Sequence, residues 1–230
     1  MVGVSVVLPC LNEEQGVGIC ISKIQSVFKE HTIDGEIIIV DNGCTDGTIN
    51  TVKSFKDDNI KIVNQPKKGY GNAYLAGFKE TNGEIIVIGD ADNSYDFYDI
   101  PRFLDEIDNG YDFVIGNRVF IQKGAMPSLH KYVGKPLFSF LLNFLFKINV
   151  SDSHCGFGCI KKESLKRLDL KSHGMEFASE ILIKARKANL RIGEIPISYS
   201  PRLGASKLRT LQDGTRHLIL ITKEFVSQIH

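Results

Sequence analysis

Short runs of β-branched residues alternate with amphipathic segments through the first half of the chain. Five apolar runs predict β-strands, at residues 5–8, 36–40, 61–63, 84–88 and 113–115. Between them, apolar residues recur at helical spacing over residues 13–29, 48–55 and 72–81. This alternation is typical of a mostly parallel sheet with flanking helices, so the pattern predicts an α/β fold of the Rossmann-like kind.

The pattern changes after Arg118. It predicts a loop, then an apolar helix over residues 137–146, a glycine-rich turn at 155–158 and a helix over 176–188. Residues 192–199 again have the composition of a strand.

Composition bounds the class of protein. The chain has 230 residues and is 43% hydrophobic, enough for one large core. We expect one domain over residues 1–207, followed by an amphipathic segment over 208–230. Lysine and arginine number 28 against 27 acidic residues, and the net charge of +1 excludes general nucleic-acid binding. The odd count of five cysteines and the absence of a basic leader predict a cytoplasmic protein with reduced thiols.

Acidic side chains stand where two of the predicted strands end. Asp41 follows the second strand, and Asp90 and Asp92 follow the fourth. Ligands of open α/β sheets bind outside the carboxyl ends of the strands, and adjacency of these two strands would place the acids in one crevice. Two carboxylates at this spacing suit Mg²⁺ or Mn²⁺ together with a diphosphate or sugar hydroxyl. An acidic surface turn is the alternative.

Two glycine-rich turns precede predicted helices. The turn at residues 41–48 has Thr45 or Asp46 as its N-cap and would let a ligand approach the backbone closely; a plain capped turn is the alternative. The turn at residues 67–72 would bring Lys68 and Gly69 to a diphosphate at a helix N-terminus, or would simply expose two solvated lysines.

The motifs occur in an order that resembles the family-2 GT-A glycosyltransferases. They are Pro9-Cys10-Leu11-Asn12-Glu13, the turn from Asp41 to Thr48, Lys68-Gly69-Tyr70-Gly71, Asp90-Ala91-Asp92 and Gly116-Asn117-Arg118. Within that family the chain resembles the polyprenyl-phosphate hexosyltransferases, the group of dolichol-phosphate mannosyltransferase. Two later segments are similar to that group, Asp152-Ser153-His154-Cys155-Gly156-Phe157 on the acceptor side and Arg202-Leu203-Gly204-Ala205-Ser206-Lys207-Leu208.

The resemblance implies a GT-A catalytic domain that uses a nucleotide sugar and Mg²⁺ or Mn²⁺. The implied donor-binding residues are Pro9, Leu11, Glu13, Val40, Asp41, Asn42, Lys68, Gly69, Asp90, Ala91 and Asp92. Asp92 is the implied metal ligand. The implied acceptor side comprises Asp152, Gly156, Arg202, Ser206 and Lys207. The implied catalytic residues are Asp90, Asp92 and three cations that face phosphate, namely Arg118, Arg202 and Lys207.

Four positions depart from the family pattern. Leu11 replaces an aromatic residue and Asn42 replaces a second aspartate, so recognition of the base or ribose would differ. Gly158 stands where an arginine is common, which would weaken binding of an acceptor phosphate, and Ser94 replaces a glutamine-like metal ligand. These departures support one alternative, a nucleotide-sugar-binding module without turnover.

The leading hypothesis is an inverting transfer of glucose or mannose, from UDP-glucose or GDP-mannose, to dolichyl or undecaprenyl phosphate. The second pKa of a phosphomonoester is about 6, so this acceptor is already a nucleophile at pH 7. No base is then needed, and we expect no catalytic role for His154 or His217. The alternative, transfer to a saccharide or protein hydroxyl, needs a base, for which Asp152 is the candidate.

Two apolar segments predict contact with a membrane surface. Residues 136–146 are too few for a spanning helix, which needs about 20, but lysines flank them. Residues 206–229 place Arg209, Arg216 and Lys223 among leucines and isoleucines, as a helix on anionic lipid would. Core packing and ordinary helix docking are the alternatives. We expect a peripheral protein at the cytoplasmic face of a membrane, or a catalytic part of a longer chain with membrane helices.

Overall fold

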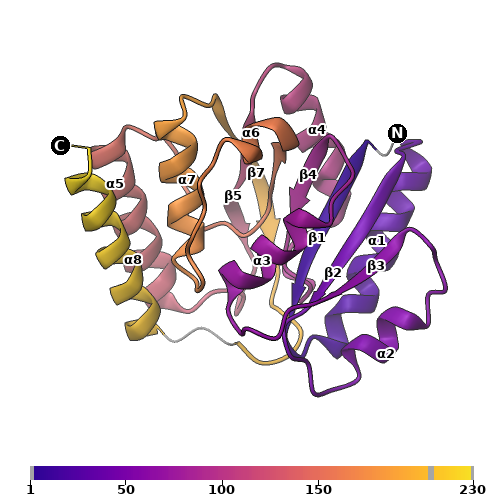
Figure 1. Cartoon of the computed structure of the whole chain (residues 1–230). Helices are drawn as coiled ribbons and strands as arrows, with labels where there is room; N and C mark the ends of the chain where they lie inside the picture. Colours follow the sequence, from indigo (N-terminus) through magenta and orange to yellow (C-terminus); the bar gives the residue numbers. More distant parts are fainter. Residues whose placement is uncertain (1–2, 207–209, 229–230) are drawn as a thin grey trace.

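Seven strands form one sheet in the order β3-β2-β1-β4-β6-β5-β7 (Figure 1). The computed structural model describes residues 3–206 and 210–228. All strand pairs are parallel except those of β6, which runs antiparallel between β4 and β5. The strands are β1 (Val4–Cys10), β2 (Gly35–Asp41), β3 (Ile60–Asn64), β4 (Ile85–Ile88), β5 (Phe113–Ile121), β6 (Gly158–Lys161) and β7 (Ile192–Tyr199). The predicted α/β fold is confirmed.

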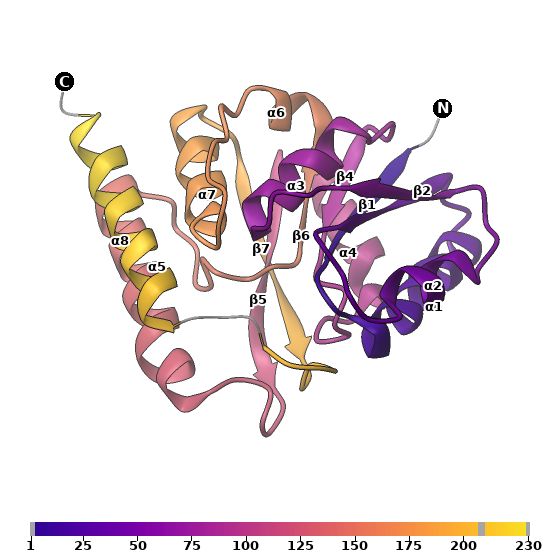
Figure 2. The same cartoon turned by 60° about the horizontal axis from the view of Figure 1, so that its bottom comes forward.

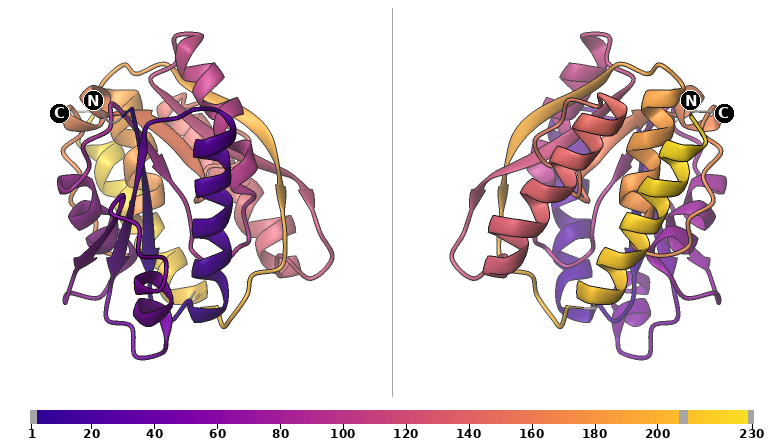
Figure 3. Two further views of the ribbon diagram at one scale, coloured as in Figure 1. Left: turned by 90° about the vertical axis from the view of Figure 1, so that its right-hand side faces the viewer. Right: turned by 90° about the vertical axis from the view of Figure 1, so that its left-hand side faces the viewer.

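Helices cover both faces of this sheet. They are α1 (Glu14–Glu30), α2 (Thr48–Lys53), α3 (Tyr70–Lys79), α4 (Ile100–Asp108), α5 (Lys135–Phe146), α6 (Lys162–Lys166), α7 (Phe177–Lys187) and α8 (Thr210–Val226), with short turns η1 (Phe97–Asp99) and η2 (His130–Gly134). One face carries α3 and α7, and the other carries α1 and α4 (Figures 2 and 3). Beyond α7, α5 and α8 pack side by side at the end of the molecule (Figure 3).

Helices on both faces of the sheet explain why the central strands are apolar throughout. Residues 37–40 of β2 and 6–8 of β1 are apolar without alternation, and all of them are buried. A strand with helices on both faces has no solvent side, so it needs no polar positions. The five predicted strands are present, and each of β1, β2 and β3 is longer than predicted at both ends.

Several elements were missed or shortened by the sequence analysis, including the short helix α6. Strand β5 continues to Ile121, where a loop was expected. Strand β6 has only four residues and gave no periodic signal beside its glycine-rich turn. Helix α4 was not predicted either; Pro101 lies in its first turn, where the missing N–H of proline costs no hydrogen bond.

The strand order corrects one expectation about the acids. Strands β2 and β4 are not adjacent, because β1 lies between them and pairs with both. The segment that leaves β1, including Leu11 and Glu13, therefore runs between the turn after Asp41 and the loop after β4. None of the described helices has both the length and the apolar content required to cross a bilayer.

Candidate active site

Three carboxylates converge at the carboxyl ends of β1 and β4. Glu13 follows β1 and is 7% exposed, and Asp92 follows β4 and is 4% exposed. Arg202, which follows β7, joins them: its Nη2 lies 3.1 Å from Glu13 Oε1 and 3.3 Å from Asp92 Oδ2. Asp92 Oδ1 accepts hydrogen bonds from the Ser94 amide at 2.9 Å and the Ser94 hydroxyl at 2.6 Å. Ser94, a departure from the family pattern, thus orients the predicted metal ligand.

The third carboxylate, Asp90, is surrounded by tyrosine and glycine residues. The Tyr70 hydroxyl donates to its Oδ1 at 3.1 Å, and a Cβ on Gly156 would come within 2.8 Å of its Oδ2. The Gly156 amide donates to the Tyr95 hydroxyl at 2.8 Å. Burial and the neighbouring Asp92 raise the pKa of Asp90 to about 7, against the lowering effects of Tyr70 and Arg202. The structure therefore brings Gly156, predicted on the acceptor side, against the predicted donor residue Asp90.

Close helix packing holds the backbone of this loop in place, through a glycine that the sequence analysis missed. A Cβ on Gly16, in the first turn of α1, would lie 2.6 Å from the Ala91 carbonyl oxygen. Glycine at that position lets α1 lie directly against the Ala91-Asp92 backbone, and Ala91 itself is buried. A glycine within the first turn of a predicted helix was the only signal of this contact.

The segment after β7 is tied to the same loop. The Ser200 amide donates to the Ser94 carbonyl at 2.9 Å, and the Leu203 amide donates to the Asp92 carbonyl at 2.9 Å. These two bonds place Arg202 over the carboxylates. Ser206, further along, is exposed, and the predicted residue Lys207 lies outside the described residues.

The predicted nucleoside pocket is only partly assembled by its predicted residues. Pro9 and Leu11, at the end of β1 and just after it, are half-buried, but Val40 has no exposed surface and belongs to the core. Asp41 Oδ1 accepts from the amides of Gly43 and Cys44 at 3.0 and 2.8 Å, which closes the turn after β2. Its carboxylate therefore shapes the turn.

Asn42 uses its whole side-chain amide within the protein. Its Nδ2 donates to the carbonyls of Gln65 and Lys67, both at 2.9 Å, and its Oδ1 accepts from the Gly69 amide at 2.8 Å. The residue that departs from the family aspartate thus binds the 65–69 turn to the end of β2. Both N–H groups of the Asn42 amide are therefore used within the protein and are not available to a ribose.

Protein carbonyls close the N-terminus of α3 in this structure, and the contact of this turn with a diphosphate stays a prediction. The amides of Gly71 and Asn72 donate to the carbonyls of Gly174 and His173, at 3.2 and 3.1 Å. Those amides are the ones that an anion at a helix N-terminus would use. Lys68 is exposed, and Gly69 lies against the His173 carbonyl.

Arg118 and Asp152 form a buried ion pair. Arg118 Nε and Nη2 lie 2.7 Å from Asp152 Oδ2 and Oδ1, and Lys135 Nζ lies 3.2 Å from Oδ2. Arg118 is 9% exposed and Asp152 is fully buried. The guanidinium lowers the pKa of Asp152 despite the burial of that carboxyl, and Asp152 in turn raises the pKa of Arg118. In this structure, the pair fixes the acceptor-side segment to β5.

A pair of histidines continues this network to α8. His154 Nε2 and His217 Nδ1 are 3.1 Å apart, and the Ser179 hydroxyl contacts them at 3.2 and 2.8 Å. The His154 carbonyl accepts from Arg118 Nη2 at 3.1 Å. Burial lowers the pKa of His217 to about 4 and lowers that of His154 as well. Both histidines thus pack against Ser179 of α7.

The free energy of unfolding is expected to fall as the pH falls from about 6.5 to about 4. The folded protein keeps His217 neutral, since its pKa is about 4, whereas the unfolded chain protonates it near pH 6.5. The unfolded state then binds more protons in that window, which destabilises the fold by on the order of 3 kcal/mol. Urea unfolding at several pH values measures this loss.

His217→Gln is expected to reduce that pH dependence, because glutamine keeps a donor and an acceptor for Ser179 and His154 but does not titrate. The control is His31→Gln, at an exposed position. Identical pH dependence in the wild type and the His217 variant would contradict the prediction.

The remaining departure, Gly158, lies inside the sheet. It is buried in β6, and a Cβ there would come within 2.5 Å of the Val114 carbonyl oxygen. The backbone of β5 would have to move to admit any side chain. The absence of arginine at this position therefore follows from the packing of this chain.

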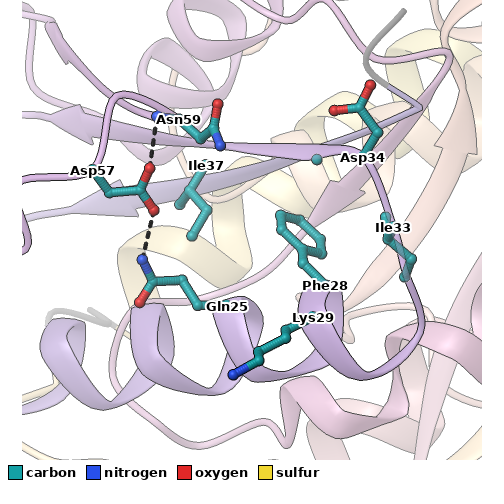
Figure 4. Close-up of a pocket in the computed structure, with 9 residues that line it drawn as sticks. Gln25, Phe28, Lys29, Ile33, Asp34, Ile37, Asp57 and Asn59 are labelled. Carbon is teal, nitrogen blue, oxygen red and sulfur yellow. Dashed lines mark hydrogen bonds between the residues drawn. The ribbon is translucent and has the colours of Figure 1, made fainter.

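Oxygen ligands for a divalent cation are present, but few. Within residues 3–206 and 210–228 there is no group of three histidine, cysteine or acidic residues arranged to hold a metal ion. Asp90 and Asp92 offer carboxylates at the end of β4, as the sequence predicted. A separate pocket, lined by Gln25, Phe28, Asp57 and Asn59, lies at the amino ends of β2 and β3, away from these acids (Figure 4).

Comparison with known proteins identifies the family. The family model described as Glycosyl transferase family 2 matches residues 5–169, which include the ends of β1, β2 and β4 and the buried Arg118–Asp152 pair. The chain belongs to glycosyl transferase family 2. The predicted resemblance and the assignment as a glycosyltransferase are confirmed.

Two curated relatives are hexose transferases by name. The low-salt glycan biosynthesis hexosyltransferase Agl6 of Haloferax volcanii is 39% identical over 218 residues, which make up 93% of this chain and 52% of that protein. The chain thus corresponds to about half of that relative's length. The dolichyl-phosphate hexose transferase of the same organism is 29% identical over 211 residues, 91% of this chain and 88% of that protein.

Solved structures share the fold. Glucosyl-3-phosphoglycerate synthase from Mycobacterium tuberculosis, in complex with Mn²⁺, uridine diphosphate and phosphoglyceric acid, aligns with a TM-score of 0.73 at 22% identity. The alignment covers 98% of this chain and 78% of that one. The same enzyme with Mg²⁺ and uridine diphosphate aligns with a TM-score of 0.72 at 21% identity. This likeness shows that the chain has the fold of those glycosyltransferases.

Proposed function

We propose that the protein transfers a hexose from a nucleotide sugar to a polyprenyl phosphate, with inversion at the anomeric carbon. The observation that carries the proposal is the state of Asp152, the acid best placed by the sequence to serve as a base. It is fully buried, paired with Arg118 and Lys135, and its pKa is lowered. A carboxylate in that state is a poor proton acceptor, which favours an acceptor that arrives as a nucleophile. A phosphate dianion does so.

The donor site is proposed at Glu13, Asp90 and Asp92. Asp90 and Asp92 stand at the carboxyl end of a buried strand, where open α/β sheets bind nucleotides. Hexosyltransferase and dolichyl-phosphate hexose transferase are the names of two relatives, which supports both a hexose donor and a lipid phosphate acceptor. UDP-glucose and GDP-mannose are the donors to test, since neither name specifies the sugar or the base.

A divalent cation fits the donor set. Asp92 Oδ2 and the carboxylate of Asp90 are hard oxygen ligands, and Mg²⁺ commonly takes only one or two carboxylates and completes its shell with water and substrate phosphates. When bound, Mg²⁺ or Mn²⁺ would neutralise charge that develops on the leaving diphosphate. Glucosyl-3-phosphoglycerate synthase, which has the same fold, has been crystallised with either ion.

The chain's own residues are proposed to do the remaining work. Ser94 holds Asp92 in orientation, and Tyr70 and Gly156 hold Asp90. Arg202 and Lys207 are proposed to meet the phosphates of donor and acceptor. Aligning the phosphate oxygen with the anomeric carbon and excluding water are then the main catalytic contributions.

Only a phosphorylated lipid is expected to receive label when polyprenyl phosphate, polyprenol and a soluble glycan are offered with radiolabelled nucleotide sugar. The rate is expected to rise with the acceptor's second ionisation, near pH 6, and then to level off. Label in the glycan alone, with a pH profile that disappears in Asp152→Asn, would support transfer to a hydroxyl instead. Donor hydrolysis without any labelled product would identify a binding module without productive transfer.

The acceptor is proposed to reach the enzyme from a membrane surface, with the protein peripheral at its cytoplasmic face. Exposed apolar side chains gather on the outer sides of η2, α5 and α8, namely Leu129, Tyr132, Val133, Leu137, Phe140, Phe144, Leu211, Leu218, Ile219 and Val226. Helix α8 buries its polar residues Asp213, His217 and Glu224. No acidic residue occurs between Asp112 and Asp152, whereas five cations do, and three of these, Lys123, Lys131 and Lys147, lie outside the ion pairs with Asp152. An apolar face with basic flanks suits anionic lipid.

Binding to anionic vesicles is expected to weaken about tenfold when Phe140 and Phe144 are both changed to serine. The variant has lost two aromatic side chains that would be transferred from water into the lipid on binding. Co-sedimentation with phosphatidylserine vesicles measures the effect. The matched control changes Ile19 and Tyr98, exposed apolar residues on other elements, to serine. Equal losses in both double variants would contradict this assignment of the lipid face.

A further inference from the structure

Arg202 binds the same carboxylates that the donor and its metal would use. Its Nη2 lies 3.1 Å from Glu13 Oε1 and 3.3 Å from Asp92 Oδ2. The side chains of both acids are less than one tenth exposed, whereas that of Arg202 is 26% exposed. One guanidinium therefore pairs with two of the site carboxylates.

The two oxygens of Asp92 have different partners. Oδ1 accepts two hydrogen bonds from Ser94, whose hydroxyl and amide both donate. Oδ2 is the oxygen that faces Arg202. A divalent cation bound through Oδ2 would stand beside the guanidinium, and like charges that close repel strongly in a buried site. Arg202 and a metal ion therefore compete for one atom.

The backbone around Arg202 is anchored, so that exchange requires only the side chain to move. Hydrogen bonds from Ser200 to the Ser94 carbonyl and from Leu203 to the Asp92 carbonyl fix the chain on both sides of it. Arg202 Nε is buried, and no acceptor for it is found in the described part of the chain. A phosphate oxygen would satisfy that donor, since guanidinium groups bind phosphate through two N–H groups at once.

We propose that Arg202 is an internal counter-ion that holds Glu13 and Asp92 before the donor binds, yields Asp92 to the divalent cation, and then turns to the diphosphate. The proposal rests on the proposed function, because it assigns the order in which the cation and the nucleotide use that site. Before the cation and the nucleotide bind, Arg202 is a positioning residue. Once they are bound, it is a ligand of the phosphates. Removing it should thus have opposite effects on the two binding steps.

The test measures Mn²⁺ binding to the full chain by electron paramagnetic resonance, without and with UDP or GDP. For Arg202→Ala, the Kd of Mn²⁺ alone is expected to be about 3- to 10-fold lower than for the wild type, because a competing positive charge is gone. The Kd of the Mn²⁺–nucleoside diphosphate complex is expected to be higher, because a phosphate ligand is gone. Arg202→Lys keeps the charge, so each of its Kd values is expected to lie between those of the wild type and of Arg202→Ala. Arg102→Ala is the matched control, since Arg102 pairs with Asp99 outside the site.

A Kd for Mn²⁺ alone that is unchanged or higher in Arg202→Ala would overturn the proposal. This holds also where the Kd of the nucleotide complex rises at the same time. Either result leaves hexose transfer intact, because that function is judged by labelled lipid product. Absence of Mn²⁺ binding in every protein, with nucleotide present, would overturn this proposal together with the metal requirement. Circular dichroism melting of each variant confirms that the comparison is between folded proteins.

Discussion

Replacing Asp92 with asparagine is expected to lower kcat/KM for sugar transfer by on the order of 100- to 1000-fold, the scale seen when one fixed electrostatic contact to a transition state is removed. The carboxylate that would bind the cation loses its charge, although the side chain keeps its shape. Transfer of radiolabelled sugar to polyprenyl phosphate, in buffer with saturating Mn²⁺, measures the effect.

The Asp92→Asn variant is expected to fold normally. Asparagine keeps an oxygen for the two Ser94 hydrogen bonds, and the backbone bond from Leu203 is unaffected. The ion pair that it loses, to the partly exposed Arg202, is worth about 1 kcal/mol or less. Asp108→Asn, the same substitution at an exposed position on α4, should retain full activity. Wild-type turnover in the Asp92 variant would refute the proposed donor site.

Removing the guanidinium of Arg118 is expected to destabilise the protein by about 3–5 kcal/mol, because Arg118→Ala leaves the Asp152 carboxylate buried without its main partner. Lys135, at 3.2 Å, remains and limits the loss. Urea unfolding followed by circular dichroism measures the free energy of unfolding. The exposed pair Arg102–Asp99 supplies the control, and Arg102→Ala should cost less than about 1 kcal/mol.

A second variant separates structure from catalysis at this pair. Adding Asp152→Leu to Arg118→Met removes both charges, and an apolar pair of similar volume is expected to recover most of the lost stability. If Arg118→Ala instead kept wild-type stability and abolished transfer, Arg118 would act directly on a phosphate. That outcome would restore the role that the sequence resemblance implied for it.

Local patterns in the sequence were sufficient for the fold class and for part of the site. Continuous apolar runs identify the central parallel strands, because a strand covered on both faces carries no polar positions. Asp90 and Asp92 were placed correctly at a strand end, since the end of an apolar run is visible in the sequence. The order of the short motifs was sufficient to identify the family, which the match over residues 5–169 confirms.

Only the tertiary structure decided which groups face one another. The pairing of Arg118 with Asp152 joins residues 34 positions apart, and that of Arg202 with Glu13 joins residues 189 apart. No local periodicity records such contacts, because they depend on the order of strands in the sheet and on how each loop is tied down. The antiparallel β6, inserted between β4 and β5, is the clearest case.

For the polar groups, too, the sequence and the tertiary structure determine different things. Asn42 has a side chain that can bind a ligand, yet its amide forms hydrogen bonds with the 65–69 turn. The N-terminus of α3 has the glycines of a phosphate site, yet the carbonyls of His173 and Gly174 occupy its amides. Sequence determines which groups can form hydrogen bonds, and the packing of distant segments determines whether a ligand or the protein itself satisfies them.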